Sequence, residues 1–349
     1  MTDGARALVI YPPVRAEWLA LREEEEVLDP DLPVIDPHHH LWERETSVYM
    51  VDDLAHDLGS GHRIVATVYV QCRSMYREHG PVEFAPLGET EFARGVARDT
   101  ADGALGRFGI CAGVVGHANL MLGDRVRPVL EAHCEAGGGR FRGIRHITAW
   151  DSDRRLLSPG YPVENSMLGD ARFRAGFAHL APLGLSFDAW IFHPQIAEVA
   201  ALARAFPETT IILDHCGSPL GIGRFAGRRD EVFRDWSAAI RDLATCPNVV
   251  VKTGGLAMGF CGHGFHAEAM PPDSDRLAAT WRPWIETCIE AFGAARCMFE
   301  SNFPVDKGSC SYRTCWNAFK KLASGAGETE RSDLFAGTAA RTYRIDATT

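Results

Sequence analysis

The chain has 349 residues, of which 46% are hydrophobic and 23% are charged, and its formal net charge at pH 7 is -10. This acidic balance argues against nucleic acid or an anionic membrane surface as a partner, although a few local arginines could still bind an anionic small substrate. No apolar stretch approaches the roughly 18 residues that span a membrane, and the short run LVIY is followed by no signal-cleavage pattern, so we expect a cytoplasmic protein.

The ten cysteines form no CxxC pair, and several lie inside apolar runs. This distribution favours reduced, buried thiols over a zinc ribbon or a disulfide framework.

Residues 1–33 read as an N-terminal extension packed on the main domain, and its acidic run REEEE (22–26) favours a solvated helix face. Eight short apolar runs follow, typical of strands. They begin at Val34, Arg63, Phe108, Phe141, Leu185, Thr209, Asn248 and Arg296. Amphipathic stretches typical of helices lie between them, at 89–101, 123–137, 170–183, 195–206, 231–244 and 274–292.

Apolar strands that alternate with helices indicate an α/β fold, with a parallel sheet covered on both faces. Eight such units predict a single (β/α)8 TIM barrel over residues 34–349, with the N-terminal extension and an extra C-terminal helix. An open doubly wound sheet is the alternative, but no GxGxxG follows the first strand. The Gly-, His- and Pro-rich segment 259–275 is a long connection after the seventh strand, of the kind that builds active sites.

Reactive side chains of a barrel project from the C-terminal ends of its strands. Titratable groups occupy most of these ends: His38, His39 and His40; Arg73 and Tyr76; Arg145 and His146; His193; Asp214 and His215; Lys252; Glu300 and Asp306. Because strand side chains alternate, His38 and His40 share one face and His39 points away. An HxH pair presents two imidazoles to one ion, so we expect a structural role for His39 and a functional one for its neighbours.

The motifs IDPHHHLW, FRGIRHI, FDAWIFHPQI, ILDHCGSP, VVVKTGGLA and CMFESNFPVDK, in this order, resemble the amidohydrolase-related family of barrel hydrolases, in its lactonase branch. The resemblance covers roughly residues 33–346. It implies that His38, His40 and His193 bind a divalent metal, Zn or Mn, together with an aspartate of the eighth strand. It also implies that His215 polarises a carbonyl group or handles a proton.

The eighth strand departs from the family pattern, because Asn302 stands where the aspartate is expected. Asparagine cannot act as a general base and carries no charge for a metal. Glu300, on the same strand face, or Asp306, in the following loop, could supply the missing carboxylate. Catalysis without a metal is the alternative.

Four further side chains are candidate substrate contacts. Arg145 could bind a substrate carboxylate bidentately, or pair with Glu300 or Asp151. Lys252 ends a strongly apolar run and could hold a carboxylate, stabilise an oxyanion or form an imine. Tyr76 and the loop residue His266 complete the set.

The first hypothesis is therefore a hydrolase that opens a carboxylate-bearing lactone by water attack, with an anionic small molecule as its substrate. The second is a metal-dependent decarboxylase of an aromatic or muconate-type acid. A non-catalytic, ligand-binding barrel is the third, but it predicts degraded strand ends and the histidines are intact. We also expect a homo-oligomer.

Overall fold

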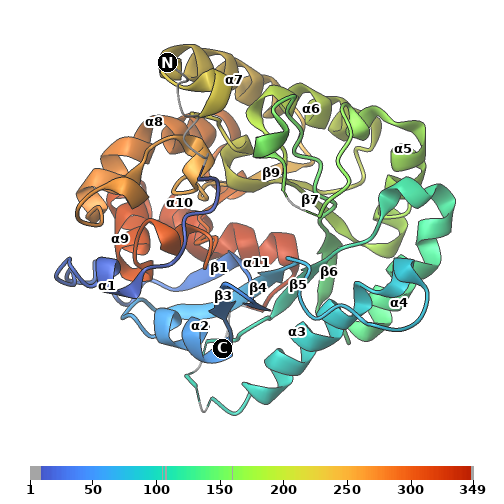
Figure 1. Ribbon diagram of the computed structural model, residues 1–349, viewed down its shortest axis with the longest axis horizontal. Coiled ribbons are helices and arrows are strands. Elements are labelled where there is room, and N and C mark those ends of the chain that lie inside the picture. The colour runs from blue at the N-terminus through green and yellow to red at the C-terminus, as the bar shows by residue number, and fades with distance from the viewer. Residues whose placement is uncertain (1–8, 104, 107, 159, 347–349) are drawn as a thin grey trace, which may run out of the picture.

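The computed structural model describes residues 9–103, 105–106, 108–158 and 160–346. The predicted strands form one parallel, eight-stranded sheet in chain order (Figure 1). They are β1 (Val34–His39), β4 (Ile64–Val70), β5 (Gly113–Gly116), β6 (Phe141–Ile144), β7 (Ser186–Ala189), β8 (Ile211–Leu213), β9 (Val249–Lys252) and β10 (Cys297–Met298). A short hairpin, β2 (Trp42–Arg44) and β3 (Ser47–Tyr49), follows β1.

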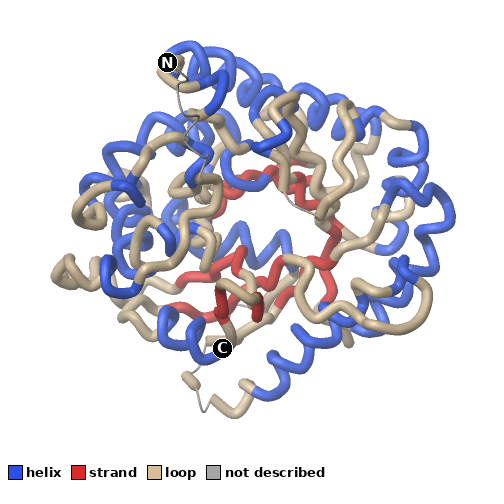
Figure 2. Tube along the Cα trace, viewed as in Figure 1, coloured by secondary structure: helices blue, strands red, loops and turns tan. Residues whose placement is uncertain are grey.

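The sheet closes on itself through the segment that follows β10. The amide of His40 donates to the carbonyl of Phe303 at 2.8 Å, and the amide of Asn302 donates to the carbonyl of His38 at 3.0 Å. Figure 2 shows the resulting ring of strands with helices outside it. The predicted (β/α)8 barrel is confirmed, and the end of β1 is fixed against the residues that follow β10.

One helix follows each strand and covers the outside of the barrel. These helices are α2 (Val51–Leu58), α3 (Leu87–Asp99), α4 (Arg127–Ala136), α5 (Ala171–Phe177), α6 (Ile196–Ala205), α7 (Arg229–Leu243), α8 (Ser274–Phe292) and α9 (Tyr312–Leu322). Every residue of β4 is buried, as expected for a strand packed on both faces.

The chain ends in α10 (Glu328–Ser332), a π-helical turn (Asp333–Gly337) and α11 (Thr338–Tyr343). Ala339 and Tyr343 of α11 share one buried apolar cluster with Ile35 of β1, Ile212 of β8 and Met298 of β10. In Figures 1 and 2 this helix lies within the outline of the strand ring. The extra C-terminal helix therefore plugs one end of the barrel.

Within residues 9–33 the N-terminal extension forms one short helix, α1 (Ala16–Leu19), and the prediction of a helix over REEEE is wrong. Residues 22–26 form no helix. The carboxylate of Glu25 accepts hydrogen bonds from the amide of Ser274, at 2.7 Å, and from Nδ2 of Asn317, at 3.1 Å. Glu25 thus bonds the first residue of α8 and a side chain of α9, and these two bonds hold the segment in an extended path.

All ten cysteines are free thiols, and nine of them are buried, as expected. Among the described residues, no helix combines the length and apolar character that a bilayer crossing requires.

Candidate active site

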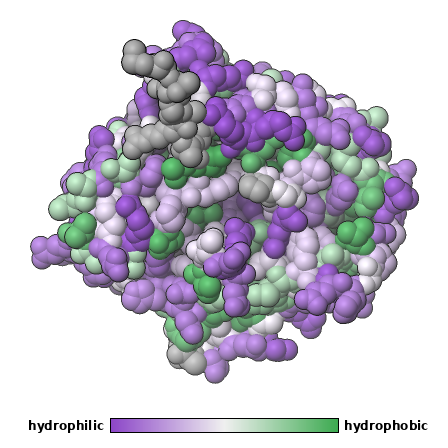
Figure 3. Space-filling model, viewed as in Figure 1, coloured by the Kyte–Doolittle hydropathy of each residue, from purple (hydrophilic) through white to green (hydrophobic). Residues whose placement is uncertain are grey.

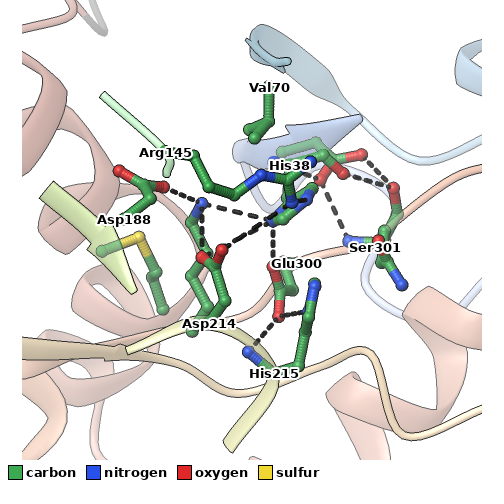
Figure 4. A network of polar contacts seen from close by, with 12 residues as sticks. His38, Val70, Arg145, Asp188, Asp214, His215, Glu300 and Ser301 are labelled. Atoms are coloured by element: carbon green, nitrogen blue, oxygen red, sulfur yellow. Dashed lines mark hydrogen bonds and ion pairs between the residues drawn. The ribbon is translucent and has the colours of Figure 1, made fainter. Parts of the chain in front are cut away.

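Glu300 joins two histidines at the C-terminal mouth of the barrel (Figure 4). Its Oε1 accepts from Nδ1 of His215 at 2.7 Å and from the His215 amide at 3.1 Å. Its Oε2 lies 2.8 Å from Nδ1 of His38. All three residues are buried, and the imidazole centroids of His38 and His215 are 4.6 Å apart. A single carboxylate therefore lies against both rings and hydrogen-bonds that of His215.

Two cations approach the ring of His38 from opposite sides. Nη1 of Arg145 lies 3.2 Å from Nε2, and Nζ of Lys252 lies 3.3 Å from Nδ1. Both cations can only donate, so they compete with Glu300 for the orientation and the proton of this ring. The pKa of His38 lies well below its ordinary value because of burial and the nearby positive charge of Lys252, so this ring is neutral.

The three consecutive histidines divide as the strand alternation predicts. The rings of His38 and His40 lie 4.9 Å apart, and Nδ1 of His40 donates to the carbonyl of Val70 at 2.7 Å. His39 instead bonds Oγ1 of Thr67 through Nε2, at 2.9 Å. Burial lowers the pKa of His39 to about 3, so it is a neutral residue of the barrel wall.

Lys252 lies fully buried among acidic groups. Its Nζ donates to Oδ2 of Asp188 at 2.6 Å and lies 3.2 Å from Oδ1 of Asp214. Burial alone would lower the pKa of Lys252, but the carboxylates of Asp188, Asp214 and Glu300 outweigh it and raise the pKa. The lysine is thus a permanent ammonium group, which is not a nucleophile for imine formation.

Asp188 was missed by sequence reasoning. It lies within β7, and its Oδ2 also accepts from the hydroxyl group of Tyr343 on α11, at 2.8 Å. The sequence signal was present, because an ionisable residue inside a buried apolar strand requires a partner.

A strained turn carries His215. It occupies Asp214–Gly217, directly after β8, where His215 has φ 57° and Cys216 has φ 53°. Non-glycine residues seldom adopt positive φ, and such strain clusters at functional sites. A Cβ atom added to Gly255 would lie 2.4 Å from Nδ1 of His215, and one added to Gly254 would lie 2.5 Å from Cγ of Glu300. The absence of side chains at Gly254 and Gly255, directly after β9, therefore leaves room for Glu300 and His215.

Asp306 and Asn302, the two candidates after β10, form a buried pair. Nδ2 of Asn302 donates to Oδ1 of Asp306 at 2.9 Å, and the amide of Ala257 donates to its Oδ2 at 3.1 Å. Burial raises the pKa of Asp306 to about 7, and the nearby His215 offsets part of that rise. The carboxyl group can therefore gain or lose a proton near neutral pH.

Asp36 is a second buried carboxylate that sequence reasoning missed. It accepts from Oγ of Ser301 at 2.5 Å, from the Ser301 amide at 3.0 Å and from the Tyr312 hydroxyl group at 2.9 Å. These bonds tie the beginning of β1 to the segment after β10, so Asp36 supports the barrel closure that positions His38.

Two other predicted site residues, His193 and His266, make contacts outside the Glu300 cluster. Nδ1 of His193 accepts from the Leu220 amide at 3.2 Å, and its ring packs against Phe225. Burial lowers the pKa of His193 to about 4. The carbonyl group of His266 accepts from Arg15 of the N-terminal extension.

His38, Asp214 and His215 can hold a divalent metal ion. Each offers one ligand atom, these atoms lie within 4.8 Å of one another, and all three residues are buried. Both oxygens of Asp214 lack a hydrogen-bond partner, and two imidazoles with a carboxylate suit zinc. The donor set therefore fits a metal, although Lys252 and Arg145 already place two positive charges beside it. His40 and His193 are not part of this cluster.

Several buried polar atoms near the mouth lack hydrogen-bond partners in the described part of the chain. They follow the C-terminal ends of β4, β6, β7 and β8, and are Nε2 of Gln71, the Tyr76 hydroxyl group, Oγ1 of Thr148, Nε1 of Trp190 and Oγ of Ser218. Nε of Arg145 also lacks a partner. Buried polar groups are normally satisfied, so ordered water or a polar ligand would meet this set. Figure 3 shows the surface hollowed near the centre of the viewed face.

Comparison with known proteins points to one family. The chain matches the family described as amidohydrolase over residues 35–345. It is 33% identical to the protein named y4mH of Sinorhizobium fredii (strain NBRC 101917 / NGR234), over 90% of this chain and 99% of that protein. It is 30% identical to an L-fucono-1,5-lactonase of Burkholderia multivorans (strain ATCC 17616 / 249), over 89% of this chain and 96% of that protein.

A solved structure agrees with these sequence relatives. It is an amidohydrolase from Burkholderia multivorans with bound zinc, which superposes with a TM-score of 0.70 at 26% identity. The superposition covers 90% of this chain and 99% of that one.

Proposed function

The chain belongs to the amidohydrolase family of hydrolases, and on that premise we propose that it opens a lactone, with water attacking the ring carbonyl group to release an open-chain hydroxy acid. The observation that carries the proposal is the carboxylate of Glu300, which contacts Nδ1 of both His215 and His38 at the barrel mouth. Two relatives named L-fucono-1,5-lactonase, at 30% and 28% identity, favour a lactone over other substrates of hydrolases.

We assign the first proton transfer to His215. Glu300 accepts the proton of its Nδ1, which leaves the lone pair of Nε2 free to accept a proton from the attacking water. The same imidazole can then return the proton to the ring oxygen as the ester bond breaks. Asp306, with its pKa near 7, is the second group able to move a proton.

A divalent ion held by His38, Asp214 and His215 would supply a Lewis acid for the carbonyl oxygen. Asp306 would then be the remaining base. The charges of Asp188, Asp214, Lys252 and Arg145 balance one another within the barrel and keep these groups in place.

The substrate class follows from which polar groups are free. Arg145 contacts His38, the carbonyl group of Gln71 and Asp214, and Lys252 contacts two carboxylates. Both cations are thus already paired with groups of the protein. The expectation of an anionic substrate was based on these two side chains. The neutral groups without partners suit hydroxyl groups, so we favour a polyhydroxylated, uncharged lactone.

Initial rates with three substrates test this function: an aldono-1,5-lactone, a carboxylated lactone and a carboxylated aromatic acid. We expect fastest turnover of the aldonolactone, measured by proton release in a weak buffer. Fastest turnover of the carboxylated lactone would contradict the proposed substrate class. Release of carbon dioxide from the aromatic acid, without lactone hydrolysis, would contradict the proposed reaction.

A further inference from the structure

Residues 9–13 of the N-terminal extension cross the mouth of the barrel. The amide of Gly259, after β9, donates to the carbonyl of Ile10 at 3.0 Å. A Cβ atom on Gly259 would lie 1.8 Å from the carbonyl oxygen of Val9, and one on Gly308, after β10, would lie 2.1 Å from that of Pro12. These contacts hold the segment at the same edge of the barrel as the histidines, and Figure 1 shows it in blue across the near face.

Tyr11, in the middle of this segment, is linked to the active site through a loop. Its hydroxyl group lies 2.7 Å from Oγ of Ser158, in the connection after β6. Three residues later, the hydroxyl group of Tyr161 donates to Oε1 of Gln71 at 2.9 Å. The carbonyl of Gln71 in turn accepts from Arg145. The N-terminal segment and the Ser158 loop therefore form one continuous cover beside the catalytic residues.

Tyr11 is partly exposed, but its hydroxyl group is fixed by Ser158. The residue is 40% exposed. Burial of the hydroxyl group raises the pKa of Tyr11 to about 12. The hydrogen bond of Ser158 and the charge of Arg145 offset part of that rise. The phenol is thus a neutral group that can stack on a sugar ring or bond its hydroxyl groups.

We propose that Tyr11 is a specificity-determining residue, which contacts the part of a bound lactone that lies farthest from the reacting carbonyl group. The residue lies outside the region 35–345 that matches the family, in the N-terminal extension. The inference rests on the proposed function for the nature of the substrate. It assigns Tyr11 to binding and not to the chemical step.

Two kinds of variant test the inference. Tyr11→Ala and Tyr11→Phe change the contact itself, and Gly259→Ala displaces the segment while leaving Tyr11 intact. Val14→Ala, at an exposed position of the same extension, and Gly169→Ala, where an added Cβ meets nothing within 4 Å, serve as controls. Each variant is assayed with a six-carbon aldono-1,5-lactone and with δ-valerolactone, which has the ring but no hydroxyl groups.

We expect Tyr11→Ala and Gly259→Ala to raise KM for the aldonolactone about tenfold, the size of one or two lost hydrogen bonds. We expect kcat for both lactones, and KM for δ-valerolactone, to stay within about threefold of wild type and of the controls. Equal effects on the two lactones, or none in the Tyr11 variants, would overturn the assignment.

A binding measurement separates this inference from the proposed function. If the wild-type protein hydrolysed neither lactone, the proposed function would fail. Calorimetric titration with the ring-opened hydroxy acid would then decide the role of Tyr11. A Kd weakened about tenfold in Tyr11→Ala supports it, an unchanged Kd overturns it, and absence of binding to wild type overturns both proposals.

Discussion

Replacing Glu300 by glutamine should lower kcat/KM without unfolding the protein. The carboxylate accepts a hydrogen bond from Nδ1 of His215 at 2.7 Å and lies 2.8 Å from Nδ1 of His38, whereas glutamine offers one oxygen and one NH2 group. If the oxygen faces His215, the NH2 group faces Nδ1 of His38, toward which Lys252 already directs its ammonium group at 3.3 Å. In either orientation glutamine removes the negative charge that lies beside both rings.

The magnitude follows from the lost charge-assisted hydrogen bond, worth about 1.5–3 kcal/mol. At about 1.4 kcal/mol for each factor of ten, this predicts a loss of roughly 10- to 150-fold in kcat/KM. Initial rates of lactone hydrolysis measure the loss, and thermal unfolding shows whether the fold survives.

Glu89→Gln is the matched control. Glu89 is also a buried carboxylate near a strand end, but it accepts from the Cys72 amide and the Tyr69 hydroxyl group, and no histidine bonds it. The reasoning is refuted if folded Glu300→Gln keeps kcat/KM within about twofold of wild type, or if Glu89→Gln loses as much activity.

Three further outcomes are expected. His39→Gln should keep turnover within about tenfold, a barrier change of roughly 1.4 kcal/mol, whereas His38→Gln and His40→Gln should lose much more; equal losses at all three would contradict the strand alternation. The raised pKa of Asp306 means that its protonated form favours folding, so stability present below pH 3.8 is lost as the pH rises through about 7. Asp306→Asn should therefore be more stable than wild type at pH 8 but not at pH 3.5 by chemical denaturation, and should lose at least about a hundredfold in turnover. Asn302→Asp should tighten zinc binding in a chelator competition and lower activity by raising the pKa of Asp306, 2.9 Å away; unchanged zinc affinity would argue against a metal near this residue.

The strands and the face of each histidine could be predicted because both depend on local sequence. Buried parallel strands read as short apolar runs, and the period of two along a strand is enough to separate His39 from its neighbours. The barrel followed from the number of such runs and the helices between them.

The charge network could not be predicted in the same way. Lys252 of β9 donates to Asp188 of β7, two strands away in the sheet. The hydroxyl group of Tyr343 donates to the same carboxylate from α11, near the C-terminus. These contacts depend on how deep each residue lies in the closed barrel, which no local pattern records. For the same reason, the ion pair of Arg145 was expected with Glu300 or Asp151, if not with a substrate, whereas Arg145 contacts His38 and lies 3.8 Å from Asp214.

The N-terminal extension illustrates a different difficulty. The acidic composition of residues 22–26 is compatible with a helix, and only the groups that Glu25 satisfies on α8 and α9 make an extended path more favourable. Tertiary hydrogen bonds here override a weak local preference.

The closure of the ring has a consequence for how the protein is made. β1 pairs with β4 and with the segment after β10. β1 is the first strand of the barrel to leave the ribosome, and its hydrogen bonds are complete only after the segment that follows β10 has been synthesised. Until Glu300 and Tyr343 have been synthesised, His38 and Asp188 lack partners that they need in a dry interior. We therefore expect the nascent chain to stay open until its C-terminal part has been synthesised. We expect hydrolytic activity to arise only after the last helix has been released.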